Sequence, residues 1–168
     1  MPARLIFLLL VLLLFLVVPP AVRLLTEWFW FGEVDYTGIF IQTLKAKASV
    51  GGVVFLVAFL ALFFNFRLAL RRVTQPFVLF PGGGDIQPVV LNQRQFALLG
   101  TGIAALLALV LGIFASNEWL TWLKYSNAEP FGQTDPLFFR DVSFYIFTLP
   151  FYTVARNLAL AVVVLSLI

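Results

Sequence analysis

The chain has 168 residues, of which 62% are hydrophobic and only 11% are charged. Soluble domains average about 45–50% apolar and about 25% charged residues, so a soluble enzyme, a disordered chain and a fibrous repeat are all disfavoured. Cysteine and histidine are both absent, which excludes disulfides, thiolate metal sites and a Ser-His-Asp triad. We therefore predict an all-α polytopic membrane protein, with residues 1–168 as a single domain, and expect neither enzymatic activity nor a cofactor.

The first apolar segment, residues 5–22, predicts a membrane span, which needs about 20 residues. Pro19 and Pro20 remove two backbone donors and are expected to kink or end this helix. The alternative is a secretory signal peptide with Arg4 in its charged region, although every small-x-small cleavage site contains one of these prolines.

Three further spans are predicted at residues 49–66, 96–115 and 149–168. Too few residues follow Arg156 and Asn157 to cross a bilayer alone. Either the helix starts as early as residue 149, with Arg156 snorkelling to the interface, or it continues beyond the chain. Because no capping signal closes it, we expect the chain to be the N-terminal fragment of a longer protein.

Small residues recur at four-residue steps along the third span, at Gly100, Ala104, Ala108 and Gly112. Such a row lets two helix backbones approach closely in a membrane. The alternative is a pore-lining face, but Thr101 is the one side chain of that span with a hydroxyl. We therefore predict helix packing.

Aromatic residues crowd the two loops expected outside the membrane, residues 26–47 and the segment after the third span. Tryptophan favours the headgroup layer, so Trp28, Trp30, Trp119 and Trp122 are predicted to be interfacial. The first loop reads as an interfacial re-entry segment, with a ligand or partner surface as the alternative. In the later loop, the spacing of Trp119, Trp122 and Leu123 predicts a short amphipathic helix.

Two more helical signals follow in that later loop. Asp135 before Pro136 is typical of a helix start, with an acid as N-cap and proline at the first helical position. Residues 141–149 are aromatic and could form a second surface helix before Pro150 restarts the chain into the membrane.

The loop between the second and third spans contains Pro81, three glycines and Asp85, which together predict a turn. A phosphate-binding loop would need lysine where Asp85 stands. The Gly-x-Gly-Asp pattern of intramembrane aspartyl proteases also fits, but that chemistry needs a second carboxylate within the spans, and none is predicted. The spacings of Glu33 with Asp35 and of Asp135 with Asp141 do not resemble a calcium loop, so no metal site is predicted.

Arginines decide the predicted orientation. Arg67, Arg71 and Arg72 follow the second span as a tight cluster, which favours a cytoplasmic N terminus in a bacterial inner membrane. An arginine cluster facing anionic lipid also explains the net charge of +3 without a nucleic-acid partner.

Three stretches together resemble the N-terminal part of uncharacterised protein family 0182: residues 30–37, residues 65–69 and residues 134–145 with 149–151. The resemblance implies a large bacterial integral membrane protein with further spans and a large extracytoplasmic region, and it implies no mechanism. One departure is Phe139, where members usually have glycine. The matching motif residues, whose role the resemblance leaves open, are Gly32, Glu33, Tyr36, Asn65, Arg67, Asp135, Pro136, Arg140, Asp141, Ser143, Phe144, Tyr145 and Pro150.

We therefore expect a membrane-anchoring and assembly module. Its partners are the lipid bilayer and the remaining spans and external domain of its own full-length chain. The alternative is part of a transporter or channel whose polar path lies in spans absent here, because these spans lack the acids that such a path uses.

Overall fold

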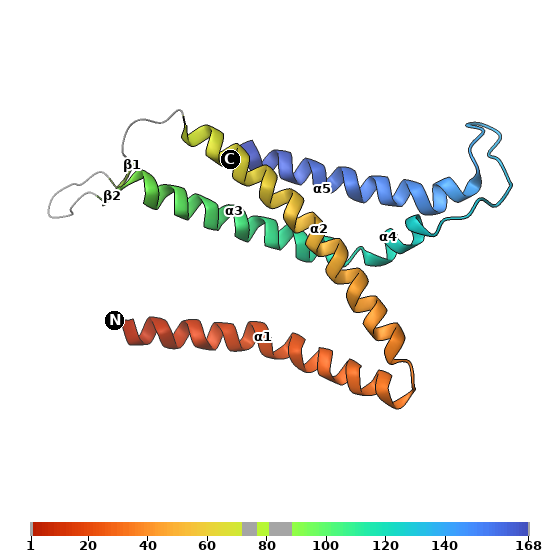
Figure 1. The fold of residues 1–168 in the computed structure, drawn as a ribbon, viewed down its shortest axis with the longest axis horizontal. Coiled ribbons are helices and arrows are strands. Elements are labelled where there is room, and N and C mark those ends of the chain that lie inside the picture. Colours follow the sequence, from red (N-terminus) through yellow and green to blue (C-terminus); the bar gives the residue numbers. More distant parts are fainter. Residues whose placement is uncertain (1, 72–76, 81–88, 168) are drawn as a thin grey trace. The chain divides into compact units, whose positions relative to one another are not determined.

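The computed structural model describes residues 2–71, 77–80 and 89–167. The chain divides into two units, residues 1–45 and 46–168, which are described separately. In chain order (Figure 1) the elements are α1 (Pro2–Glu33), α2 (Thr37–Leu70), β1 (Phe77–Phe80), β2 (Val89–Leu91), α3 (Gln93–Ser116), α4 (Trp119–Ser126), the π-helical turn η1 (Phe144–Thr148) and α5 (Leu149–Leu167).

The first helix does not end at its two prolines. Of the two expected effects of these prolines, an end of the helix is wrong, because α1 continues for 32 residues through Pro19 and Pro20. Proline fixes φ near −65°, which is a helical value, although it removes the hydrogen bond of its missing N–H and its ring crowds the carbonyl four residues earlier. The helix therefore tolerates the pair and carries on into the aromatic segment.

The predicted first loop, residues 26–47, is also mostly helical. It shrinks to a tight turn at Val34–Tyr36 between α1 and α2. Asp35 occupies the left-handed region with φ 62°, and the N–H of Tyr36 donates to the Phe31 carbonyl at 2.9 Å. The prediction of a long loop over residues 26–47 is thus wrong, because a left-handed residue after a helix caps its last carbonyls and reverses the chain without a long connection.

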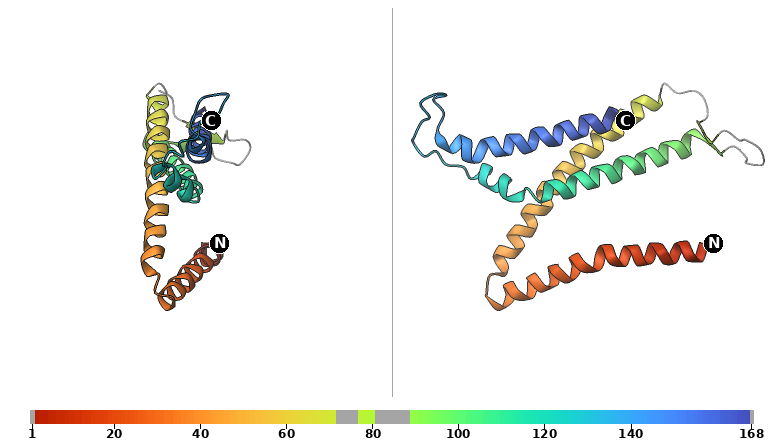
Figure 2. Two further views of the ribbon diagram at one scale, coloured as in Figure 1. Left: turned by 90° about the vertical axis from the view of Figure 1, so that its right-hand side faces the viewer. Right: turned by 180° about the vertical axis from the view of Figure 1, so that it is seen from behind.

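The second unit contains the later part of α2 with α3, α4 and α5. Its small core includes Ala58 and Leu62 from α2 with Ala104, Ala108 and Ala115 from α3. Figure 2 shows α5 returning alongside α3, with α4 between their ends. No polar or charged side chain is buried in the part of the chain that the structure describes, while many large apolar side chains are exposed, as expected of lipid-facing helices.

Strands β1 and β2 form a short antiparallel hairpin after α2, pairing Phe77 with Leu91 and Val78 with Val90. Residues 81–88 between them, which include the predicted Pro81–Asp85 turn, lie outside the described residues. The all-α class is confirmed, with this hairpin as its one addition among the residues described.

Among the described residues, four helical segments are long and apolar enough to cross a membrane: Leu13–Glu33, Thr37–Leu70, Gln93–Ser116 and Phe144–Leu167. The last begins earlier than predicted, because helical structure starts at Val142 and passes through η1 into α5. The expected separate surface helix over residues 141–149 is therefore wrong. In η1 the N–H of Leu149 donates to the Phe144 carbonyl, five residues earlier. This wider π-helical turn lets the helix adapt to Pro150, which has no N–H to donate.

Candidate functional site

The segment between α4 and η1 is a loop held by two aspartates, Asp135 and Asp141. We call residues 129–141 the aspartate loop. The Asp141 carboxylate accepts backbone N–H bonds from Phe131 at 3.1 Å, Gly132 at 2.8 Å and Ser143 at 2.8 Å. One side chain thus ties the start of the loop to the start of the following helix.

Asp135 organises the tip of the same loop. Its carboxylate accepts N–H bonds from Leu137 at 3.3 Å and Phe138 at 3.1 Å, and the Tyr145 hydroxyl donates to it at 2.9 Å. The backbone closes below it, where the N–H of Asp135 donates to the Arg140 carbonyl at 2.8 Å. The helix start predicted at Asp135 and Pro136 is wrong: the capping bonds exist, but the chain makes only one turn, because it reverses at Phe139 to pair with itself.

These hydrogen bonds lower the pKa of both aspartates. The backbone N–H of Ser143, the Ser143 hydroxyl and the N–H of Phe131 hold the pKa of Asp141 at about 2. The Tyr145 hydroxyl, followed by the N–H groups of Phe138 and Leu137, lowers the pKa of Asp135. Both carboxylates are therefore ionised acceptors at neutral pH, a role that suits loop fixation better than proton transfer.

Two residues of the loop adopt left-handed backbone conformations, Gly132 with φ 72° and Phe139 with φ 54°. Glycine adopts this region without a Cβ penalty, whereas phenylalanine does not. The N–H of Phe139 donates to the Asp135 carbonyl at 2.9 Å. The turn is thus formed with phenylalanine at the position where the resemblance leads one to expect glycine.

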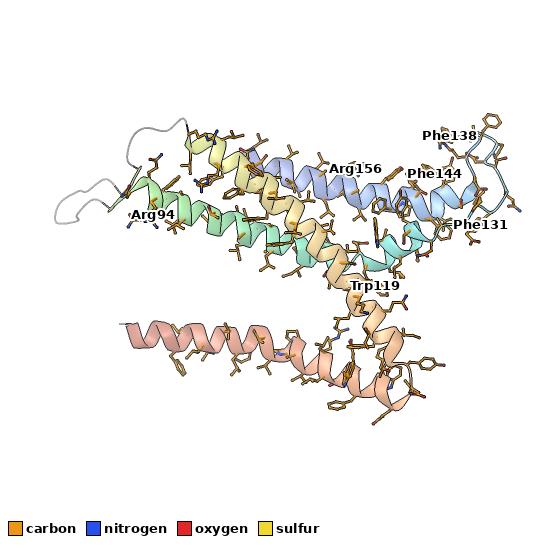
Figure 3. The ribbon with its side chains drawn as sticks, in the orientation of Figure 1. Arg94, Trp119, Phe131, Phe138, Phe144 and Arg156 are labelled. Carbon is orange, nitrogen blue, oxygen red and sulfur yellow. The ribbon has the colours of Figure 1, made fainter. Side chains whose placement is uncertain are left out.

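The loop presents three consecutive apolar side chains at its tip: Leu137 is 79% exposed, Phe138 71% and Phe139 80%. Figure 3 shows Phe138 pointing away from the helices. Behind the tip, the Arg140 guanidinium lies 5.3 Å from the ring centroid of Phe144. We call Leu137, Phe138 and Phe139 the apolar tip. The apolar tip was not predicted as a surface, although its signal in the sequence is simple: three apolar residues between a capping acid and an arginine.

Aromatic side chains join α4 to α5 beneath the loop. The rings of Tyr125 and Phe151 stack at 4.1 Å between centroids, and Trp122 lies 5.5 Å from Phe151. The short helix predicted around Trp119 and Trp122 is therefore present as α4, and Trp122 packs on Phe151 while 41% of it stays exposed.

The other predicted interfacial tryptophans lie elsewhere. Trp119 faces the α2 side, with the Lys47 ammonium 5.9 Å from its ring. In the first unit, Trp28 lies edge-on to Phe40 at 5.7 Å and Trp30 edge-on to Phe31 at 5.0 Å. The contact of Trp28 with Phe40 joins the end of α1 to the start of α2, whereas Trp30 and Phe31 both belong to α1.

The small residues of α3 lie against α2. A Cβ on Gly112 would come within 2.8 Å of the Gly51 carbonyl oxygen, and one on Gly51 within 2.9 Å of the Gly112 oxygen. Ala104 and Ala108 are buried along the same row, while a Cβ on Gly100 would overlap the ring of Phe66. The two helices therefore approach backbone to backbone at one crossing, which only glycine allows.

An open apolar cavity of about 440 Å³ lies between α2, α4 and α5. Val53 and Val57 line one wall, Ala155 and Ala159 the opposite wall, and Trp122 one end. Such lining offers dispersion contacts but little that would orient a polar substrate.

The remaining motif residues do not converge on one centre. Gly32, Glu33 and Tyr36 surround the α1–α2 turn, and Asn65 and Arg67 lie at the opposite end of α2. Ser143, Phe144, Tyr145 and Pro150 form the entry to α5, next to Asp135, Pro136, Arg140 and Asp141 of the aspartate loop. The structure thus assembles only the last motif into a single site. Within the described ranges, no group of three or more acids could hold a metal ion.

Comparison with known proteins shows to which family the chain belongs. The profile of an uncharacterised protein family, UPF0182, matches residues 4–168. The chain belongs to family UPF0182. A UPF0182 protein of Streptomyces coelicolor is 36% identical over 149 residues, covering 85% of this chain and 14% of that protein.

Other UPF0182 relatives give the same proportions. The match to one from Cupriavidus necator is 35% identical and covers 80% of this chain and 15% of that protein. The match to one from Mycobacterium leprae is 33% identical and covers 94% of this chain and 16% of that protein. The chain therefore spans about one-seventh of the length of the curated UPF0182 relatives it matches. No solved structure matches it.

Proposed function

We propose that this chain is a membrane-anchoring and assembly module of the bacterial inner membrane whose aspartate loop docks on an extracytoplasmic region of the same protein. The observation that carries the proposal is the apolar tip: Leu137, Phe138 and Phe139 are almost fully exposed on a loop fixed by two ionised carboxylates. Exposed apolar side chains on a preorganised loop are characteristic of docking sites, because little ordering entropy is lost on binding.

The length of the relatives supports a partner region within the same polypeptide. About six-sevenths of each relative lies outside the part matched by this chain, so the family has ample additional chain that could cover the tip. The charged residue beside the tip is Arg140, which already contacts the Phe144 ring; the tip itself offers only apolar atoms.

A site-specific photo-crosslinker tests this proposal. A benzophenone amino acid at position 138, introduced into the native protein in its own membrane, is expected to cross-link to a segment of the same polypeptide outside residues 1–168. The same group at Leu160, which is exposed on α5, is the matched control and should label lipid. Lipid labelling alone at position 138 would refute docking.

A second candidate, part of a transporter or channel, is favoured by one observation. Arg156 lies midway along the candidate span Phe144–Leu167, with its guanidinium donating to the Asn157 side-chain oxygen at 3.1 Å. Ionisable residues inside spans commonly mark ion or substrate paths. Loss of an ion flux in proteoliposomes of the native protein on Arg156→Leu, with assembly unchanged, would establish this role in place of anchoring.

A further inference from the structure

A second cavity lies at the opposite end of the second unit from the aspartate loop. Its volume is about 820 Å³, and it is enclosed by the C-terminal end of α2 and the N-terminal end of α3. Arg67 and Arg71 line it from the α2 side and Arg94 from the α3 side. We call it the arginine cavity. Figure 3 shows Arg94 at the first turn of α3.

The cavity has a strongly positive wall. Within the described ranges, Arg67, Arg71 and Arg94 form no ion pair; the Arg67 guanidinium lies instead over the Phe63 ring at 5.3 Å. The first turn of α3 adds the partial positive charge of its N-terminal N–H groups on the same side. The acids of this unit that the structure describes all follow the far end of α3: Glu118, Glu129, Asp135 and Asp141.

Apart from Asn92, Gln93 and Thr101, the rest of the lining is apolar. Phe63 and Phe64 from α2 and Leu98 from α3 line the cavity along the helices, and the Arg67 guanidinium covers the Phe63 ring. A positive end joined to an apolar wall matches a molecule with an anionic head and a hydrocarbon tail. A free phosphate ion would contact only the arginines. Because these side chains are exposed, water competes with the ion and weakens its attraction to their charges.

The position of the cavity also fits a lipid. Both helices that form it are candidate membrane spans, and the arginines occupy their ends, where headgroups lie. Basic pockets between transmembrane helices commonly hold the headgroups of acidic lipids. Arginine suits this role because its planar fork bonds two phosphate oxygens at once.

We propose that the arginine cavity binds the phosphate of an anionic phospholipid, held by Arg67, Arg71 and Arg94, with its acyl chains along Phe63, Phe64 and Leu98. The inference is independent of docking by the aspartate loop, since it involves the other end of the helices. It adds a lipid site to a chain otherwise proposed only to anchor and assemble.

Native mass spectrometry of the native protein, purified from its membrane, tests the proposal, with phosphatidylglycerol and phosphatidylcholine of identical acyl chains as probes. Phosphatidylglycerol should be retained at least tenfold more tightly. Arg94→Gln should weaken its binding roughly fivefold, and Arg67→Gln with Arg71→Gln and Arg94→Gln together roughly 100-fold. Arg23→Gln removes the same charge from an exposed residue of α1 and should leave binding unchanged.

Three results would overturn the inference: equal retention of both lipids, equal effects of Arg94→Gln and Arg23→Gln, or displacement of the lipid by inorganic phosphate at millimolar concentration. The last would assign the arginines to a free anion. Because Arg94 is exposed, its variant is expected to fold, and an unchanged helical circular dichroism spectrum verifies this.

Discussion

The Asp141 carboxylate accepts a 2.8 Å hydrogen bond from the backbone N–H of Gly132, nine residues earlier in the chain. This bond and the one to the Phe131 N–H close the aspartate loop on itself. The consequence is a loop whose closure depends on the ionised side chain of Asp141, while Asp135 organises its tip.

The first prediction concerns pH. The pKa of Asp141 is lowered to about 2 from its ordinary value of 3.8. A lowered pKa in the folded state contributes stability above the unfolded-state value, and this contribution is lost as pH falls from about 4 to about 2. Pepsin, which cuts beside exposed phenylalanine, should cleave at Phe138–Phe139 increasingly over that interval. Asp141→Asn should be cleaved readily at pH 4 already; identical pH profiles for both proteins would contradict the role of this carboxylate.

The second prediction concerns the left-handed residues. Phe139→Gly should stabilise the loop by up to about 1 kcal/mol, because glycine adopts φ near +54° without penalty. Gly132→Ala should destabilise it by about 1 kcal/mol for the converse reason, since its φ is +72° and no atom crowds its Cβ. Proteolysis at neutral pH compares the two. Docking by the apolar tip should nevertheless weaken in Phe139→Gly, since the variant removes one exposed ring.

The third prediction concerns the α2–α3 crossing. Gly112→Ala places a Cβ 2.8 Å from the Gly51 carbonyl oxygen, so the helices must separate, at a cost of about 1–3 kcal/mol. Gly102→Ala lies on the same helix with nothing within 4 Å of its Cβ and should cause no loss. Unfolding in sodium dodecyl sulfate, followed by circular dichroism, measures both. Equal midpoints would mean that the crossing does not stabilise the unit.

The fourth prediction separates the two tryptophans of α4. Trp122→Ser removes the ring that packs on Phe151 and should lower the free energy of unfolding by about 1–2 kcal/mol. Trp119→Ser removes a partly buried ring and a contact with Lys47 worth about 0.5 kcal/mol, but it leaves the ring contacts between α4 and α5 in place, so we expect the smaller loss. The same detergent titration ranks them, and the reverse order would show that α4 is held through α2 rather than α5.

The fifth prediction concerns orientation, and it uses the absence of native cysteine. Phe138→Cys should react with an impermeant maleimide in intact cells, whereas Gln93→Cys, beside Arg94, should react only after lysis, because arginine-rich loops remain cytoplasmic. Labelling at position 93 in intact cells would invert the proposed topology.

Sequence patterns predicted much of this architecture for physical reasons that can be stated. Apolar runs of bilayer length located the helices, and the four-residue repeat located the face of α3 that meets α2. Patterns failed where local signals were overridden. Pro19 and Pro20 predict a kink or an end of the helix, but α1 does not end there and continues through an apolar segment. Patterns also failed at Asp135 and Pro136, where a helix signal stands in a chain that pairs with itself across Thr134 and Asp141.

The aspartate loop itself was beyond prediction from one sequence. Its decisive bonds link Asp141 to Phe131 and Gly132, and Tyr145 to Asp135. These contacts join residues nine or ten apart in an irregular segment, and no periodicity marks them. The arginine cavity could be predicted only in part. Arg67 and Arg71 form a cluster in the sequence, but Arg94 comes close to them only because α3 returns antiparallel to α2.

The uninterrupted course of α1 has a consequence for its surroundings. Pro19 and Pro20 carry no N–H, so the carbonyl oxygens of Phe15 and Leu16 lose the donors that an ordinary helix supplies four residues later. Within hydrocarbon no solvent replaces those donors, and each vacant acceptor is costly. Two adjacent acceptors therefore call for a hydroxyl, an amide or a trapped water from a neighbouring segment, which makes this stretch of α1 better suited to a protein–protein seam than to lipid.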